Sequence, residues 1–249
     1  FSKRKNITVA SKLAPYPWRL GRSGFIKAFN SSNIRLKNNL DRVQLHWSTY
    51  RYAPWQEIAL IDGLADLVEN GSVKEIGVSN MGPKRLKWMH NRLHKRGITI
   101  KSIQIQFSLL SPLKKQSPSI QNICQELNIE LIAYSPLALG ILGLPIESKR
   151  LPSSFIRKNL FIRLLKKSYP IRYELNKIAV ARKVTPAQVA LNWCRSHKAM
   201  PIPGIRNPEQ AKDAINALNW MLSMKEKQRL DFLVSESQAR MPRNPFSSD

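Results

Sequence analysis

Short runs of apolar and β-branched residues recur along the chain, and each run is followed by a segment with the periodicity of a helix. The runs are almost continuously apolar instead of alternating with polar residues, which is typical of strands buried on both faces of a parallel sheet. The pattern predicts strands over residues 7–11, 42–47, 75–79, 102–107, 130–134 and 200–203. It predicts helices over residues 23–39, 55–70, 83–96, 117–127, 172–182, 186–197, 208–218 and 225–235. Strands that alternate with helices in this way indicate the α/β class.

Some of the predicted helices have recognisable ends. Thr185 and Asn207 each precede a proline, which places an N-cap side chain before a proline at the first helical position. Gly71 follows the second helix, as a left-handed closing residue would. Residues 137–168 are rich in Pro, Gly, Ser and basic side chains and predict a long loop. Nothing marks a domain boundary, so we expect residues 1–249 to form a single domain.

Six strand–helix units fit either an open doubly wound sheet or an eight-stranded barrel that lacks two strands. Polar side chains gather where the predicted strands end: Lys12, His46, Ser79, Asn80, Gln104, Gln106, Tyr134 and Ser135. In a barrel these ends converge on one mouth, where active sites lie. No Gly-x-Gly-x-x-Gly turn follows the first strand, which counts against a Rossmann nucleotide site.

Composition excludes several classes of protein. Of the 249 residues, 43% are hydrophobic, so the chain can bury a core and is not globally disordered. The two cysteines, Cys124 and Cys194, are too few for a disulfide framework and indicate a reducing compartment, either the cytoplasm or an organelle stroma. No run of 18 or more apolar residues is present, so we expect no membrane span. The chain opens on Phe1 without a signal peptide, which indicates either processing or a fragment with an upstream start.

The net charge is +25, from 41 basic and 16 acidic side chains. A surplus of this size normally favours a nucleic-acid or anionic partner. Here the basic residues are scattered in pairs and triplets, none of which reaches the five or more like charges that mark an interaction tail. We therefore do not favour a nucleic-acid partner, despite the net charge.

Six segments carry a more specific signal when they are taken in order. They are Val9-Ala10-Ser11-Lys12, residues 40–47 (Leu-Asp-Arg-Val-Gln-Leu-His-Trp), residues 71–80 (Gly-Ser-Val-Lys-Glu-Ile-Gly-Val-Ser-Asn), residues 103–110, residues 133–140 and residues 201–210. Together they resemble the motifs of the third to eighth strands of the aldo-keto reductase family. The resemblance covers nearly the whole chain. It implies a (β/α)8 barrel that binds NADP(H) in an extended form and reduces carbonyl groups by hydride transfer from NADPH.

The resemblance also assigns catalytic positions. The family uses a Tyr as general acid, a Lys that lowers the pKa of this Tyr, an Asp that holds the Lys, and a His that orients the substrate carbonyl. Lys12 and His46 match the Lys and the His. The family's Asp and Tyr precede the Lys, but the eleven residues before Lys12 include neither. We therefore expect the first two strands of the barrel to be missing from this chain.

The remaining matched positions concern the cofactor and the substrate. Ser79, Asn80 and Gln104 correspond to the residues that hydrogen-bond the nicotinamide carboxamide, and Tyr134 to the aromatic ring that stacks under the nicotinamide. The residues matched to the pyrophosphate and to the 2′-phosphate loop are Ser135, Leu137, Gly140, Gly204, Arg206 and Gln210. Arg206 favours NADP over NAD because a guanidinium makes bidentate contacts with phosphate. No metal site is expected.

Substrate specificity is expected in the loops at the barrel mouth. Trp18, Trp47 and Tyr50 are candidates for an aromatic pocket that takes a flat carbonyl substrate. Other functions stay open beside the reductase. The chain could be a non-catalytic NADP-binding or regulatory member of the family, or an inactive fragment. A basic nucleic-acid-binding protein is less favoured.

Overall fold

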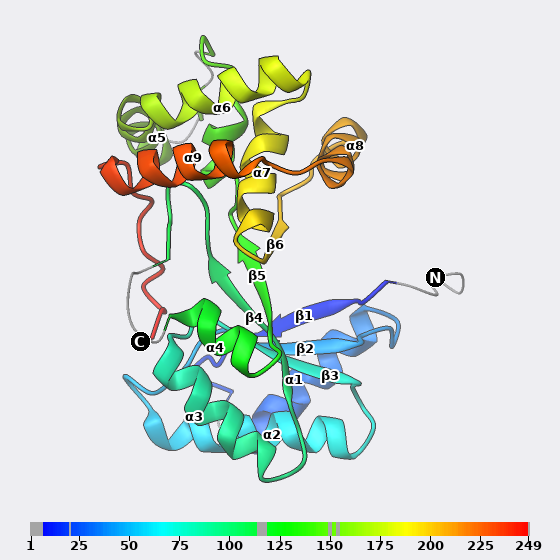
Figure 1. Ribbon diagram of the computed structural model, residues 1–249. Coiled ribbons are helices and arrows are strands. Elements are labelled where there is room, and N and C mark those ends of the chain that lie inside the picture. The colour runs from blue at the N-terminus through cyan, green and yellow to red at the C-terminus, as the bar shows by residue number, and fades with distance from the viewer. Residues whose placement is uncertain (1–6, 20, 114–118, 149–150, 153–154, 249) are drawn as a thin grey trace. The chain divides into compact units, whose positions relative to one another are not determined.

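The computed structural model describes residues 7–19, 21–113, 119–148, 151–152 and 155–248, and strands alternate with helices along them (Figure 1). The strands are β1 (Ala10–Leu13), β2 (Arg42–Leu45), β3 (Glu75–Ser79), β4 (Ile100–Gln106), β5 (Glu130–Tyr134) and β6 (Ala199–Ile202). The helices are α1 (Gly21–Arg35), α2 (Pro54–Glu69), α3 (Pro83–His94), α4 (Ile120–Glu126), α5 (Phe155–Lys167), α6 (Tyr169–Arg182), α7 (Pro186–Ser196), α8 (Pro208–Asn216) and α9 (Met224–Glu236), with short 3-10 helices η1 (Ala138–Gly143) and η2 (Ala217–Asn219). The predicted α/β class is confirmed.

The strands follow one another through one six-stranded sheet in chain order, and β1 to β4 pair in parallel. The register places Lys12 opposite Gln44, Gln44 opposite Gly77, and Gly77 opposite Ser102. Two residues further along, Ser79 lies opposite Gln104. Parallel pairing thus brings the carboxyl ends of these four strands to one edge.

The chain forms two compact units. Unit 1 comprises Phe1–Ile105, Gln116–Leu131 and Asn244–Asp249, and unit 2 comprises Gln106–Lys115 and Ile132–Arg243. In unit 1, α1 packs on β1, α2 packs on β3, and α3 packs against α2, over a core that includes Phe25, Phe29, Val43 and Leu64 (Figure 1). In unit 2, α6, α7 and α9 pack on one another around buried side chains such as Trp193 and Leu175.

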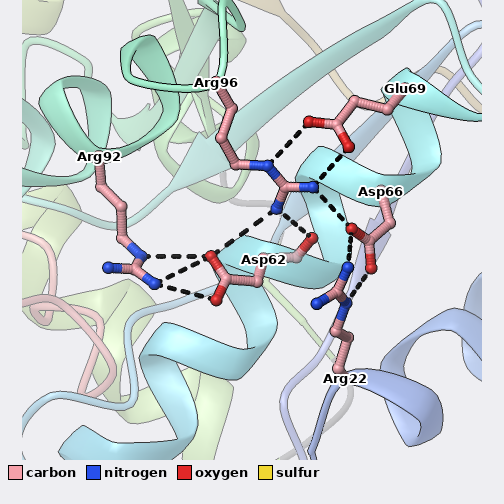
Figure 2. A network of polar contacts seen from close by, with 6 residues as sticks. All are labelled: Arg22, Asp62, Asp66, Glu69, Arg92 and Arg96. Atoms are coloured by element: carbon pink, nitrogen blue, oxygen red, sulfur yellow. Dashed lines mark hydrogen bonds and ion pairs between the residues drawn. The ribbon is translucent and has the colours of Figure 1, made fainter.

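Charged side chains connect helices α1, α2 and α3 of unit 1. Figure 2 shows the network of Arg22, Asp62, Asp66, Glu69, Arg92 and Arg96. Arg96 of the α3 end donates to Glu69 at 2.6 Å and to Asp66 at 2.8 Å, and Arg22 of α1 also pairs with Asp66. Pairs that are this exposed contribute only about 0–1 kcal/mol each. Their main effect is therefore to fix how α1 and α3 lie along α2.

Two predicted elements differ from the structure. The first strand, predicted over 7–11, is the ladder Ala10–Leu13, because Val9 is bonded to the Asp41 side chain and to the Asp41 and Arg42 amides before the ladder begins. The predicted loop over 137–168 contains helix α5, in which Phe161 and Leu164 are buried three residues apart. The basic and Ser-rich flanks obscured this short apolar stripe. Whether residues 1–249 form a single domain stays a prediction.

The helix ends that the sequence predicts at Thr185, Asn207 and Gly71 are confirmed. The Thr185 hydroxyl accepts from the Gln188 amide at 3.2 Å, and Asn207 Oδ1 accepts from the Gln210 amide at 2.9 Å. Gly71 has a φ of +72°, the left-handed conformation predicted for it. Local sequence therefore determined where these helices begin and end.

Gly77 of β3 has no room for a side chain. A Cβ there would lie 2.5 Å from Ser102 Oγ and 3.0 Å from Gln44 Cγ. We expect Gly77→Ala to lower the free energy of unfolding by about 1–3 kcal/mol, the usual cost of overpacking a core. Gly204→Ala is the control, because a Cβ at Gly204 meets nothing within 4 Å. Equal urea midpoints for the two variants would contradict the packing described for β3.

Candidate active site

Lys12 and His46 lie at the carboxyl ends of neighbouring strands in unit 1. Lys12 is in β1, and its Nζ donates to Gln104 Oε1 of β4 at 3.1 Å. His46 directly follows β2, and its backbone amide donates to the Leu13 carbonyl at 3.0 Å. The parallel register of β1 to β4 brings Lys12 close to Gln104.

The turn after β3 holds this group together. Asn80 has a φ of +60°, a left-handed conformation that Asn tolerates better than most residues. Its side-chain Nδ2 donates to the His46 carbonyl at 3.0 Å and to Ser79 Oγ at 3.1 Å. The Ser79 hydroxyl in turn donates to the Gln104 carbonyl at 2.8 Å. Ser79 and Asn80 therefore bridge β2 and β4, while Gly82, and not either of them, is the N-cap of α3.

The electrostatics of the group depend on burial and on one cation. Partial burial lowers the pKa of Lys12. Burial also lowers the pKa of His46, and the positive charge of Lys12 lowers it further. Since the ordinary pKa of a histidine is about 6.5, His46 is a neutral imidazole at pH 7. The site thus offers a partly desolvated cation beside a neutral imidazole.

The predicted aromatic residues separate into two places. Trp47 is 6% exposed, and its indole Nε1 donates to the Tyr52 hydroxyl at 2.7 Å. Tyr16 stacks on Trp18 at a centroid distance of 4.6 Å and meets Trp47 edge-on at 5.7 Å. Tyr50 does not join them. Its ring lies 3.6 Å from the guanidinium of Arg85.

Unit 2 carries the other predicted cofactor residues. Tyr134 ends β5, and Ser135 follows with a φ of +52°. Leu137 is the N-cap of η1, where Leu139 and Gly140 have φ values of +61° and +90°. Successive left-handed residues turn the backbone sharply. Nothing lies within 4 Å of a Cβ built on Gly140, so this turn has an open side.

Arg206 and Gln210 lie at the start of α8. Gln210 Oε1 accepts from the Arg206 amide at 2.8 Å, while the Gln210 amide donates to the Asn207 side chain. Arg206 is exposed, and so is Gly204. The guanidinium therefore stands in solvent beside a helix N-terminus, where the helix dipole also favours anions.

Sequence reasoning missed a buried carboxylate that contacts the segment after His46. Glu57 of α2 is 1% exposed, accepts from the Ser48 hydroxyl, and pairs with Arg85 at 3.1 Å. Burial raises the pKa of Glu57. An acidic residue in a first helical turn usually interacts with the helix dipole in solvent, so nothing in the sequence indicates that Glu57 fixes the segment after His46.

Little in the described residues indicates metal, membrane or thiol chemistry. Among them, no three His, Cys, Asp or Glu side chains converge as a metal site would require. No helix in that part of the chain is long and apolar enough to cross a membrane. Cys124 and Cys194 are free and buried, and burial raises the pKa of the Cys124 thiol to about 12.

The coupling of Lys12 and His46 can be measured directly. Lys12→Met removes the cation that disfavours protonation of His46, so we expect the pKa of His46 to rise toward its ordinary value. Titration of the imidazole proton signals by NMR measures this change. Lys84→Met, an exposed residue of α3, is the control and should leave the pKa unchanged. An unchanged or lower pKa in Lys12→Met would contradict the described electrostatics.

Comparison with known proteins identifies the relatives of this chain. It is 42% identical to a chloroplastic pyridoxal reductase of Arabidopsis thaliana over 99% of its own length and 67% of the relative's. It is 27% identical to aldo-keto reductase str7 of Strobilurus tenacellus, over 97% of this chain and 73% of that protein. The solved structure of MGS-M4, an aldo-keto reductase enzyme from a deep-sea metagenome library of the Medee basin, matches with a TM-score of 0.71 and 20% identity, over 98% of this chain and 77% of that one.

A structure only 20% identical supports the fold alone, which is the α/β fold of aldo-keto reductases. The family itself rests on a sequence model, which matches residues 2–234. With six motifs in family order and this match over most of its length, the chain belongs to the Aldo/keto reductase family of oxidoreductases.

Proposed function

We propose that this chain binds NADPH and directs hydride transfer to the carbonyl carbon of an aldehyde or ketone. The observation that carries the proposal is the hydrogen-bonded group of Lys12, His46, Ser79, Asn80 and Gln104 at one edge of the unit 1 sheet. These are five of the positions that the family resemblance assigns to catalysis and to the nicotinamide end of the cofactor. Family membership supports a nicotinamide-dependent oxidoreductase in general.

The donor and acceptor atoms of this group fit a primary carboxamide. Lys12 donates to Gln104 Oε1, so the Gln104 amide is oriented with Nε2 as a donor on its other side. Within the described residues, no hydrogen bond uses Gln104 Nε2. Asn80 uses Nδ2 toward His46 and Ser79, so its acceptor Oδ1, which takes a hydrogen bond from Asn244 in this structure, is the atom that would accept from a ligand. A donor for a C=O and an acceptor for an NH2 are what the carboxamide of nicotinamide requires.

The phosphate end of the cofactor fits residues of unit 2. A Cβ on Gly140 or on Gly204 would meet no atom within 4 Å, so both backbones are open to close approach. Arg206 offers a charged, planar donor group at the N-terminus of α8. We assign the 2′-phosphate to Arg206 and the pyrophosphate to Ser135, Leu137 and Gly140.

Each residue of the reactive group has a definable task. NADPH, when bound, supplies the hydride. His46, as a neutral imidazole, donates a hydrogen bond that orients the substrate carbonyl. The Lys12 ammonium stabilises negative charge that develops on the carbonyl oxygen. In the family pattern the proton comes from a Tyr that precedes this Lys; the residues before Lys12 include no Tyr, so in this chain solvent water would protonate the alkoxide that hydride transfer leaves.

We place the substrate among flat aromatic aldehydes. Trp47 follows His46 directly, and Tyr16 and Trp18 extend its aromatic surface. A relative that is 42% identical is a pyridoxal reductase, which acts on an aldehyde of this kind by its name. That relative is chloroplastic, and the two buried free cysteines suit a reducing compartment, the cytoplasm or an organelle stroma.

The proposal is tested by cofactor binding and turnover together. We expect the chain to bind NADPH more tightly than NADH, and to oxidise NADPH in the presence of pyridoxal. Arg206→Ala should weaken NADPH binding about tenfold, or about 1.4 kcal/mol, and leave NADH unaffected, because only NADPH carries the 2′-phosphate. Lys212→Ala, an exposed cation of α8, is the matched control.

The outcomes separate the alternatives. NADPH binding without turnover over a panel of aldehydes and ketones would support the non-catalytic NADP-binding member of the family. Failure to bind either dinucleotide would contradict the proposal. Equal effects of Arg206→Ala on NADPH and NADH would contradict the assignment of the 2′-phosphate.

A further inference from the structure

The last described residues lie against the turn after β3. The Ser248 amide donates to the Asn80 carbonyl at 3.0 Å, and the Gly82 amide donates to the Ser248 carbonyl at 2.5 Å. Ser248 is 2% exposed and forms a parallel bridge with Met81. We call residues 244–248 the C-terminal strap.

Two side chains of the strap reach the candidate active site. Asn244 Nδ2 donates to Asn80 Oδ1 at 3.1 Å. The ring of Phe246 stacks on Trp47, with a centroid distance of 4.3 Å and an interplanar angle of 18°. Asn244 Oδ1 accepts from the Phe246 amide at 2.9 Å, which keeps the two strap residues in a fixed turn. The strap therefore touches both the residue after His46 and the residue assigned to the carboxamide.

The contact between Asn244 and Asn80 has the chemistry of the proposed ligand. Asn244 presents a primary carboxamide, and its N–H bonds to the same Oδ1 that would accept from the NH2 of nicotinamide. The ring of Phe246 stacks on the indole of Trp47, and the same indole lies next to the imidazole of His46. One short segment thus offers the two groups, a carboxamide and an aromatic ring, that the cofactor and substrate would bring.

We propose that the C-terminal strap is an intramolecular competitor for the nicotinamide end of the cofactor, and that Asn244 is the residue that sets this competition. The inference rests on the proposed NADPH site. In the closed state Asn244 occupies Asn80 Oδ1, and Phe246 covers Trp47. Cofactor binding through its nicotinamide then requires the strap to leave, so the apparent affinity for NADPH is reduced by the fraction of chains that are closed.

The strap is held by contacts that can be exchanged. Its described residues form no helix, and the bridge of Ser248 with Met81 is isolated and does not continue as a strand. Phe246 remains 47% exposed although it stacks on Trp47. Segments with few buried contacts open at a lower free energy than the core, so an open state is accessible without unfolding the sheet.

A ligand that lacks nicotinamide distinguishes competition from a structural role. Adenosine 2′,5′-bisphosphate carries the 2′-phosphate and the adenine of NADPH but has no carboxamide. Removal of a competitor at Asn80 strengthens the binding of NADPH and leaves this half-ligand unchanged. Loss of a structural support weakens both ligands, or the fold itself.

We would measure the Kd of NADPH and of adenosine 2′,5′-bisphosphate for four proteins by calorimetry. They are the full chain, Asn244→Ala, a chain that ends at Arg243, and the control Asn91→Ala, an exposed residue of α3. Asn244→Ala should tighten NADPH binding about 2- to 10-fold, the range of one hydrogen bond, and the shortened chain at least as much. The half-ligand should bind all four proteins equally.

Each other outcome has a definite meaning. Unchanged or weaker NADPH binding in Asn244→Ala, with the half-ligand still bound, would overturn the competition and leave the proposed function standing. Tighter binding of both ligands would also overturn it, because the effect would then not arise at the nicotinamide end. If neither ligand bound any of the four proteins, the proposed function would fail and the competition with it.

Discussion

The side-chain amide of Asn80 is the contact on which the candidate active site depends. It donates to the carbonyl of His46 and to the hydroxyl of Ser79, so it joins the ends of β2 and β3. Ser79 extends the connection to the backbone of Gln104 on β4. Strand pairing alone brings these residues near one another. The amide uses its donors on His46 and Ser79 and leaves Oδ1 as an acceptor, which Asn244 meets in this structure.

The two units carry different sets of candidate groups. Unit 1 holds the cation, the imidazole and the amides suited to a carboxamide, while unit 2 holds the sharp turn at Gly140 and the exposed Arg206. The positions of individual arginines indicate more about their roles than the net charge of +25 does. In unit 1, Arg22, Arg85 and Arg96 are paired with carboxylates, which assigns them to packing between helices and loops. Arg206 stands at a helix N-terminus, where an anion would be bound.

Patterns of local chemistry predicted much of the fold. The β-branched run at 75–79 and the cap at Thr185 agree with the structure because each depends on neighbours in sequence. The hydrogen bond of Lys12 with Gln104 spans 92 residues, so only the family motifs could indicate that they belong together. Burial of Glu57 and docking of Asn244 on Asn80 carry no sequence signal, because both arise from tertiary contacts of ordinary polar residues. Helix α5 was obscured by its basic flanks.

The carboxamide assignment is tested most directly by changing one group on the ligand. The 3-acetylpyridine analogue of NADP⁺ has a methyl group where the carboxamide has NH2, so it cannot donate to Asn80 Oδ1. The wild-type chain should bind NADP⁺ about 2- to 12-fold more tightly than the analogue, as expected for one hydrogen bond, and Asn80→Ala should abolish the difference. Equal affinities in the wild-type chain, or a difference that persists in Asn80→Ala, would contradict this account.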